Sequence, residues 1–137
     1  MRTKIYEIPN KLLVEWEPTV RAVIDTWTTY FISLDEFRDA ILTHGVNYAK
    51  AYKAQAWIVD SHKAKGVFSP EIQDFIVSDI FPTFAQIGIK YFMTINAEEA
   101  VTRLTVNQYS SKVGPHGLKL IEGSSTNGAI EWLKKNT

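Results

Sequence analysis

The chain has 137 residues, 45% of them apolar, and no cysteine, which predicts one domain with a packed core and excludes a disulfide scaffold or a thiolate metal site. Lysine plus arginine and aspartate plus glutamate each number 15, so no net charge draws the chain toward nucleic acid. Its apolar runs are far shorter than the roughly 20 residues of a membrane span, and no apolar signal core follows Met1, so we expect a cytoplasmic protein whose single domain covers residues 1–137.

Three segments near the amino end alternate apolar and polar residues with the period of two that strands show. They are residues 4–8, 11–17 and 20–27. In the third segment Arg21 and Asp25 alternate with Val20, Ala22 and Ile24, and we expect them on the polar face, away from Leu12, Val14 and Trp16. With a turn at Pro18-Thr19, the pattern predicts a hairpin of antiparallel strands.

The period then changes to the 3.6 residues of a helix. Ser33-Leu34-Asp35-Glu36 has the form of a capping box. Apolar residues recur at helical spacing as far as Tyr52, with Gly45 as the one weak point in the stripe. The next segment, Ala56-Trp57-Ile58-Val59, is apolar without alternation, which predicts a central strand covered on both faces.

A second helix start follows at Ser69-Pro70-Glu71. These residues supply an N-cap hydroxyl, a proline at the first helical position and an acid near the positive end of the helix dipole. An apolar stripe with helical spacing continues from there to Ile87. Pro82 interrupts the stripe, so we expect a kink or a break near Phe81.

The remaining sequence alternates strand and helix patterns. Residues 89–95 and 117–121 are predicted strands, Asn96 to Glu99 is the predicted capped start of a third helix, and Ser124 or Ser125 caps a final one. The order βββαβαβαβα predicts an α/β fold with one mixed sheet. Its antiparallel hairpin lies at an edge, and its later strands are parallel with crossover helices.

Several local strings accompany this order of elements. They are Trp57-Ile58-Val59-Asp60, Gly66-Val67-Phe68-Ser69-Pro70-Glu71, Phe81-Pro82, the strand entry from Gly88 to Ile95, and Ala129-Ile130-Glu131-Trp132-Leu133. Together they resemble the SpoIIAA-like family of small bacterial proteins, within the STAS and SEC14-like superfamily. The resemblance covers nearly the whole chain and implies a STAS-like α/β domain.

The resemblance also implies a regulatory position. In phosphoregulated members, a serine stands at a helix N-terminus a short distance after the aspartate that ends a strand, and counting nine residues from Asp60 reaches Ser69. Phe68 replaces the aspartate that precedes the serine in that pattern. We therefore expect Ser69 to be a structural N-cap, with a regulated phosphosite as the alternative.

The predicted ligand site is the loop that begins with Asp60, Ser61 and His62. Open α/β sheets bind ligands at the carboxyl ends of parallel strands. Consecutive residues of an extended segment point apart, so these three do not predict a catalytic triad. His44, His62 and His116 lack partners at metal-ligand spacing, and the glycines form no phosphate-binding loop, so we predict neither a metal nor another cofactor.

Trp27, Tyr30 and Phe31 bracket the turn between the third strand and the first helix. Val23 and Trp27 fall on the polar side of that strand, which gives its end more apolar area than protection of a sheet edge requires. We expect a homodimer through the surface formed by the opening hairpin and the 27–31 turn. One alternative is that Glu15, Glu17, Arg21 and Asp25 protect this edge of the sheet. The other is that one or two of the aromatic side chains belong to the core.

These features favour a non-catalytic protein-interaction or regulatory module, and not an enzyme. Its partner would be another protein or a second copy of the chain. The alternative, which SEC14-like membership implies, is a carrier of a small apolar or lipid-like ligand, held between the sheet and the helices around residues 69–87. A closed core would argue against the carrier, whereas a pocket with a few converging polar groups would favour it.

Overall fold

Three antiparallel strands form a meander at the amino end, where apolar and polar residues alternate. The computed structural model describes residues 2–137. The strands are β1 (Thr3–Ile8), β2 (Leu12–Glu17) and β3 (Ala22–Trp27). Three parallel strands follow: β4 (Ala56–Asp60), β5 (Tyr91–Ile95) and β6 (Lys119–Gly123). The order in the sheet is the order in the chain, β1-β2-β3-β4-β5-β6. The predicted mixed α/β sheet, with its antiparallel hairpin at one edge, is confirmed.

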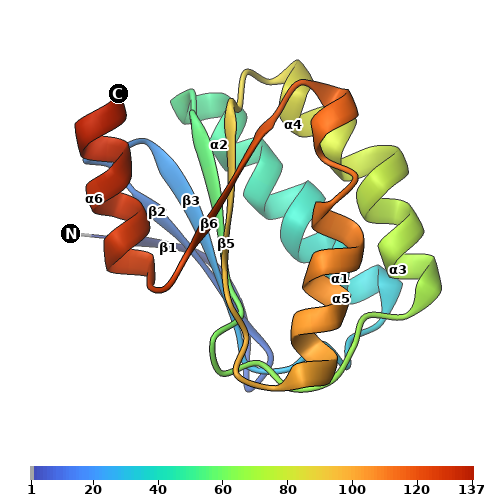
Figure 1. The fold of residues 1–137 in the computed structure, drawn as a ribbon. Coiled ribbons are helices and arrows are strands. Elements are labelled where there is room, and N and C mark those ends of the chain that lie inside the picture. The colour runs from blue at the N-terminus through green and yellow to red at the C-terminus, as the bar shows by residue number, and fades with distance from the viewer. Residues whose placement is uncertain (1) are drawn as a thin grey trace.

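Helical crossovers join the parallel strands and lie on one face of the sheet (Figure 1). The first is α1 (Leu34–Phe37), η1 (Arg38–Val46) and α2 (Asn47–Tyr52); the second is α3 (Pro70–Phe75), η2 (Ile76–Ile80) and α4 (Phe81–Gln86); the third is α5 (Ala100–Ser110), followed by the 3₁₀ turn η3 (Gly114–His116). The segments η1 and η2 are π-helical. The opposite face carries α6 (Thr126–Asn136), so each face of the sheet has its own apolar core.

Local capping chemistry fixes the helix starts. Ser33 and Glu36 form the expected capping box at α1, and Ser69 caps α3, its hydroxyl accepting from the Ile72 N–H at 3.2 Å. Ser125 caps α6 in the same manner. Pro82 lies in the first turn of α4, just past the end of η2, so the expected interruption near Phe81 is a change from π- to α-helical winding.

Two predicted boundaries are wrong. The third helix begins at Ala100 rather than near Asn96, and the side chain of its N-cap, Glu99, does not cap the helix. Glu99 instead accepts a hydrogen bond from the Gly66 N–H at 2.7 Å. The last strand occupies Lys119–Gly123 rather than 117–121, because Gly117 adopts a left-handed conformation that ends the preceding 3₁₀ turn.

The outer edge of the sheet at β1 is protected by features of its own. Its pairing with β2 shifts register between Lys4 and Tyr6, and Lys4 forms an exposed ion pair with Glu7. Irregular pairing and charged side chains are common protections against pairing with another chain. Within residues 2–137, no helix combines the length and apolarity needed to cross a bilayer.

Candidate functional site

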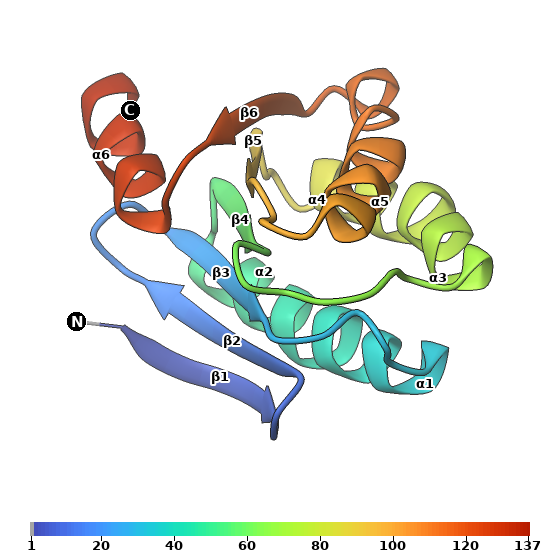
Figure 2. The ribbon, with the colours of Figure 1, turned by 60° about the horizontal axis from the view of Figure 1, so that its bottom comes forward.

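The carboxyl ends of β3, β4 and β5 meet at one edge of the sheet. The segment after β3 and the segment after β4 run side by side there (Figure 2). They are joined by backbone hydrogen bonds, from the Tyr30 N–H to the Lys65 carbonyl at 2.8 Å and from the Lys65 N–H to the Thr28 carbonyl at 3.2 Å. This edge therefore gathers the predicted ligand loop and the predicted interface in one region.

Asp60, Ser61 and His62 do not form a common site. The Asp60 carboxylate accepts from the His62 backbone N–H at 3.0 Å and from the Thr126 hydroxyl at 2.7 Å. The buried Ser61 hydroxyl is hydrogen-bonded to the Tyr30 hydroxyl. The exposed His62 ring lies 3.0 Å from a Glu98 carboxylate oxygen. Each polar group thus serves a separate structural contact.

The three aromatic residues of the predicted interface have different environments. Trp27 and Tyr30 are only 3% and 0% exposed and belong to the core, where the Tyr30 ring stacks on Phe68 with centroids 3.8 Å apart. Phe31 is 66% exposed. Of the three, only Phe31 is available to a partner.

The face assignment of β3 in the sequence prediction is wrong. Register pairs Val23 with Trp16, Asp25 with Val14 and Trp27 with Leu12, and directly paired residues point to the same side of a sheet. Helices α1 to α4 cover that side. Asp25, expected on the polar face, is 3% exposed.

Asp25 is the functional candidate that the sequence reasoning missed. One carboxylate oxygen, Oδ2, accepts from the Trp57 indole N–H at 2.8 Å. The other, Oδ1, has no hydrogen-bond partner. Burial raises the pKa of Asp25 to about 7, and the Trp57 hydrogen bond offsets part of that rise. The signal that could have revealed the burial of Asp25 is the register of the β2–β3 hairpin, which pairs Asp25 with the apolar Val14.

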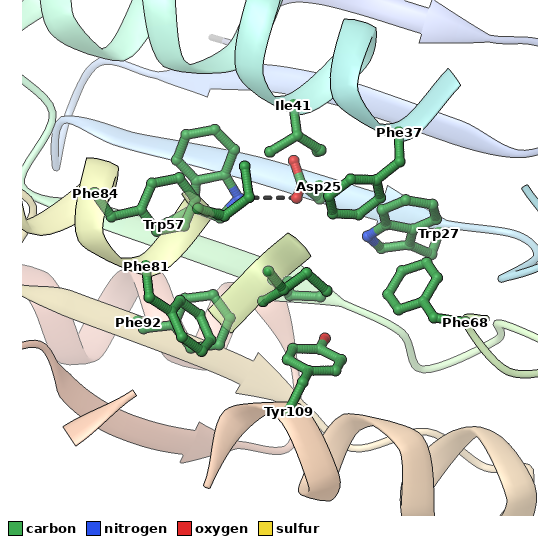
Figure 3. A pocket seen from close by; sticks show the side chains of 13 residues that line it. Asp25, Trp27, Phe37, Ile41, Trp57, Phe68, Phe81, Phe84, Phe92 and Tyr109 are labelled. Carbon is green, nitrogen blue, oxygen red and sulfur yellow. Dashed lines mark hydrogen bonds between the residues drawn. The ribbon is translucent and has the colours of Figure 1, made fainter. Parts of the chain in front are cut away.

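A small cavity lies beside Asp25, between the sheet and the helical layer (Figure 3). Its other lining side chains are buried and almost all apolar: Trp27, Phe37, Ile41, Trp57, Val59, Phe68, Ile76, Ile80, Phe81, Phe84, Phe92 and Tyr109. The cavity leaves about 20 Å³ for the centre of a water molecule, which is enough for one water-sized group. A lipid-like molecule does not fit a cavity of this size.

Two exposed apolar side chains, Phe31 and Val67, lie beside Gly66 at the carboxyl ends of the parallel strands. The Phe31 ring covers Gly66 so closely that a Cβ atom there would lie 2.5 Å from it, and Val67 is the next residue. The Gly66 carbonyl accepts from the Thr102 hydroxyl at 2.6 Å, which brings the first turn of α5 to the same place.

On that turn Val101 is exposed, and Leu104, one turn further along α5, is exposed as well. We call Phe31, Val67, Val101 and Leu104 the Gly66 patch. Among residues 2–137, the only other large apolar side chain that is exposed is Tyr52, on α2.

Comparison with known proteins finds no matching family model, no matching curated protein and no matching solved structure. Within the described residues, no group of three or more histidine, aspartate and glutamate side chains is arranged to hold a metal ion.

Proposed function

We propose that this chain is a non-catalytic regulatory module that binds another protein through the Gly66 patch. The observation that carries the proposal is that four of the five large apolar side chains exposed among residues 2–137 lie on the segments that hydrogen bonds bring together at Gly66. Three chain segments contribute to the Gly66 patch: the β3–α1 connection, the β4–α3 connection and the first turns of α5. A folded chain can cover or dilute such a patch, so its persistence on the surface indicates an interaction site.

The size of the Gly66 patch favours a transient complex with a different protein. The four exposed side chains present roughly 400 Å² of apolar surface, within the range of functional patches on monomeric proteins. Obligate homodimers bury about 2,000 Å² or more. Trp27 and Tyr30, which would have enlarged a self-complementary surface, are in the core. We therefore favour a partner protein that inserts an apolar side chain beside Phe31.

A non-catalytic role is supported by the way in which the polar groups of this edge are used. The Asp60 carboxylate holds the start of α6 through Thr126, and the Ser61 hydroxyl is buried against Tyr30. A nucleophile and its base need to face each other and an open substrate site. These side chains instead face different elements of the fold.

We assign the fold to the STAS/SpoIIAA-like group as part of this proposal. The support is the order βββαβαβαβα and the position of Ser69, which caps α3 at the same edge as the Gly66 patch. Ser69 is exposed, and it lines a surface groove together with Phe31, Val67 and Pro70. A charge placed on its hydroxyl would therefore lie beside the proposed docking surface.

The test compares three baits in extract of the native cell. They are the wild-type chain, a patch variant that combines Phe31→Ser with Leu104→Ser, and a control, Tyr52→Ser, which removes the exposed apolar side chain of α2. We expect a protein that both the wild type and the control retain and that the patch variant loses. That protein, once purified, should bind the wild type and the control equally. Equal retention of every captured protein by the patch variant would contradict the proposal.

A further inference from the structure

Positively charged side chains gather at the amino ends of the parallel strands, at the opposite end of the sheet from the Gly66 patch. Helices α2, α4 and α6 all end there (Figure 1). Arg21 immediately precedes β3, Lys53 lies in the α2–β4 connection, and Lys90 immediately precedes β5. Together with Gln55, all three line one surface groove. We call these four residues the basic groove.

Backbone hydrogen bonds hold the residues of the basic groove side by side. The Gln55 N–H donates to the Arg21 carbonyl at 2.8 Å, and the Lys90 N–H donates to the Gln55 carbonyl at 2.9 Å. Arg21 and Lys90 are therefore two strand spacings apart, roughly 10 Å at the backbone. The Arg21 guanidinium also donates to the Lys53 carbonyl at 3.2 Å, which brings the α2–β4 connection to the same place. Long side chains from three segments can thus reach one small anion.

The positive charge of the basic groove is not neutralised within the protein. No carboxylate side chain lines the groove. None of the ion pairs within residues 2–137 involves its three cations. Glu17, at the end of β2, has partners of its own: its carboxylate accepts from the Thr19 hydroxyl at 2.8 Å and lies 3.5 Å from Arg2. The groove therefore has excess positive charge for a ligand.

The backbone is strained at two of the three cations. Arg21 and Lys53 have φ angles of 50° and 58°, and Asn10 is the only other non-glycine residue with a positive φ in the described part of the chain. Glycine adopts this left-handed conformation without strain and is the usual residue there. Such strain is common at ligand sites. The negative end of the α2 dipole favours a cation at Lys53, but it does not explain Arg21, which follows a hairpin turn.

We propose that the basic groove binds a phosphate group, either on a small organic molecule or free in solution. A phosphate monoester carries nearly two negative charges at pH 7 and presents three acceptor oxygens, so it matches three cations better than a carboxylate does. The Arg21 guanidinium donates to Lys53 and Gln55 and retains further N–H donors for the phosphate.

A second groove, of about 490 Å³, shares Arg21 and Lys90 with the basic groove and extends to Tyr91. This volume is typical of small-molecule sites, and it leaves room for the organic part of a phosphorylated ligand. The basic groove shares no residue with the Gly66 patch, so the phosphate site does not depend on the proposed function.

The experiment follows backbone amide signals by NMR while the full chain is titrated with phenyl phosphate, inorganic phosphate or benzoate at constant pH and ionic strength. Phenyl phosphate should shift the signals of residues 19–21, 53–55 and 88–91 saturably. Benzoate, which has the ring but not the phosphate, should bind about tenfold more weakly. Tighter binding of phenyl phosphate than of inorganic phosphate would identify a phosphorylated organic molecule as the ligand class, and equal binding would identify free phosphate.

Glycine substitutions separate binding from folding. Arg21→Gly and Lys53→Gly each remove a cation and relieve the left-handed strain, so both should keep the wild-type unfolding temperature and bind phenyl phosphate about tenfold more weakly. Asn10→Gly relieves the same strain in the β1–β2 turn, at the opposite end of the sheet, and should bind as the wild type does. Lys63→Gly removes a positive charge from the β4–α3 connection and should also bind normally, which excludes an effect of net charge.

Undiminished binding in both Arg21→Gly and Lys53→Gly, or the absence of saturable shifts with either phosphate in the wild type, would overturn the proposal. Tighter binding of single-stranded DNA than of phenyl phosphate would also overturn it, because the cations would then form a nucleic-acid surface. Lys90→Gln, which leaves the backbone unchanged, repeats the test if a glycine variant fails to fold.

Discussion

The indole N–H of Trp57 donates a hydrogen bond to Asp25 Oδ2 at 2.8 Å, joining β4 to β3 beneath the helical layer. Both side chains are buried. The bond satisfies the only polar atom of the Trp57 side chain, yet it leaves Asp25 Oδ1 unpaired. The hydrogen bond satisfies the Trp57 indole, whereas an ionised Asp25 carboxylate loses hydration that this single bond does not replace.

Asp25 should make the protein less stable as the pH rises from about 4 to 7. Its pKa is about 7 in the folded chain, against 3.8 for an ordinary aspartate, so over this range the folded state binds a proton that the unfolded state has released. The Asp25 contribution should lower the free energy of unfolding by up to about 1.4 kcal/mol per pH unit. Urea denaturation at a series of pH values measures the slope.

The matched control for this slope is Asp25→Asn, which cannot ionise. The variant should lose most of the decline between pH 4 and 7, while Asp79→Asn, on the surface of η2, should retain it. An identical pH dependence in the wild type and in Asp25→Asn would show that Asp25 ionises at an ordinary pH.

Gly45→Ala should destabilise the protein, although alanine is the better helix former. A Cβ atom at Gly45 would lie 2.7 Å from the Trp57 ring, and that ring is enclosed in the core. We expect a loss of about 1–3 kcal/mol from overpacking, measured by chemical denaturation. Gly114→Ala is the comparison, because a Cβ atom there meets open space; an equal loss at both glycines would rule out the steric explanation.

Ser69→Ala should lower the free energy of unfolding by about 0.5–2 kcal/mol, because the Ile72 N–H loses its acceptor at the start of α3. Ser69→Asp should be nearly neutral, since a carboxylate also caps a helix. Thermal and urea unfolding of both variants measures the difference. Phosphoserine at this position in protein from the native host would contradict the prediction of a purely structural cap.

The purified chain should be a monomer at micromolar concentrations, contrary to the homodimer expected from the sequence. Trp27 and Tyr30 are buried and therefore cannot contribute to a dimer interface. The irregular pairing and the charged side chains of β1 also disfavour pairing with the β1 strand of a second copy. Multi-angle light scattering determines the mass directly. A dimer that the Phe31→Ser and Leu104→Ser changes dissociate would make a second copy the occupant of the Gly66 patch.

Much of the fold could be predicted from local patterns. Alternation marks the meander, the Ser33 capping box and the Ser-Pro-Glu start mark two helices, and an unbroken apolar run marks the central β4. These signals are local because backbone hydrogen bonds and caps involve near neighbours in the chain. The Ser33 and Ser69 caps accordingly lie where the sequence places them.

The candidate site could not be predicted in the same way. Whether Asp25 faces solvent depends on the register with β2 and on the helices that cover that side, which are far away in the sequence. The π-helical winding over Ile41 and Ile80 has no composition signature that distinguishes it from an ordinary helix. Likewise, the Gly66 patch exists only because the β4–α3 connection is held against α5.

The helix α6 is the only helix that covers its face of the sheet within the described residues. Beneath it lie Ala22, Ile24, Ile58 and Met93, contributed by three different strands. During synthesis, the apolar surface of those strands has no cover until residues 126–136 have been made. The nascent chain is therefore vulnerable to aggregation until α6 is made, and a truncation before Ser125 should need a chaperone to stay in solution.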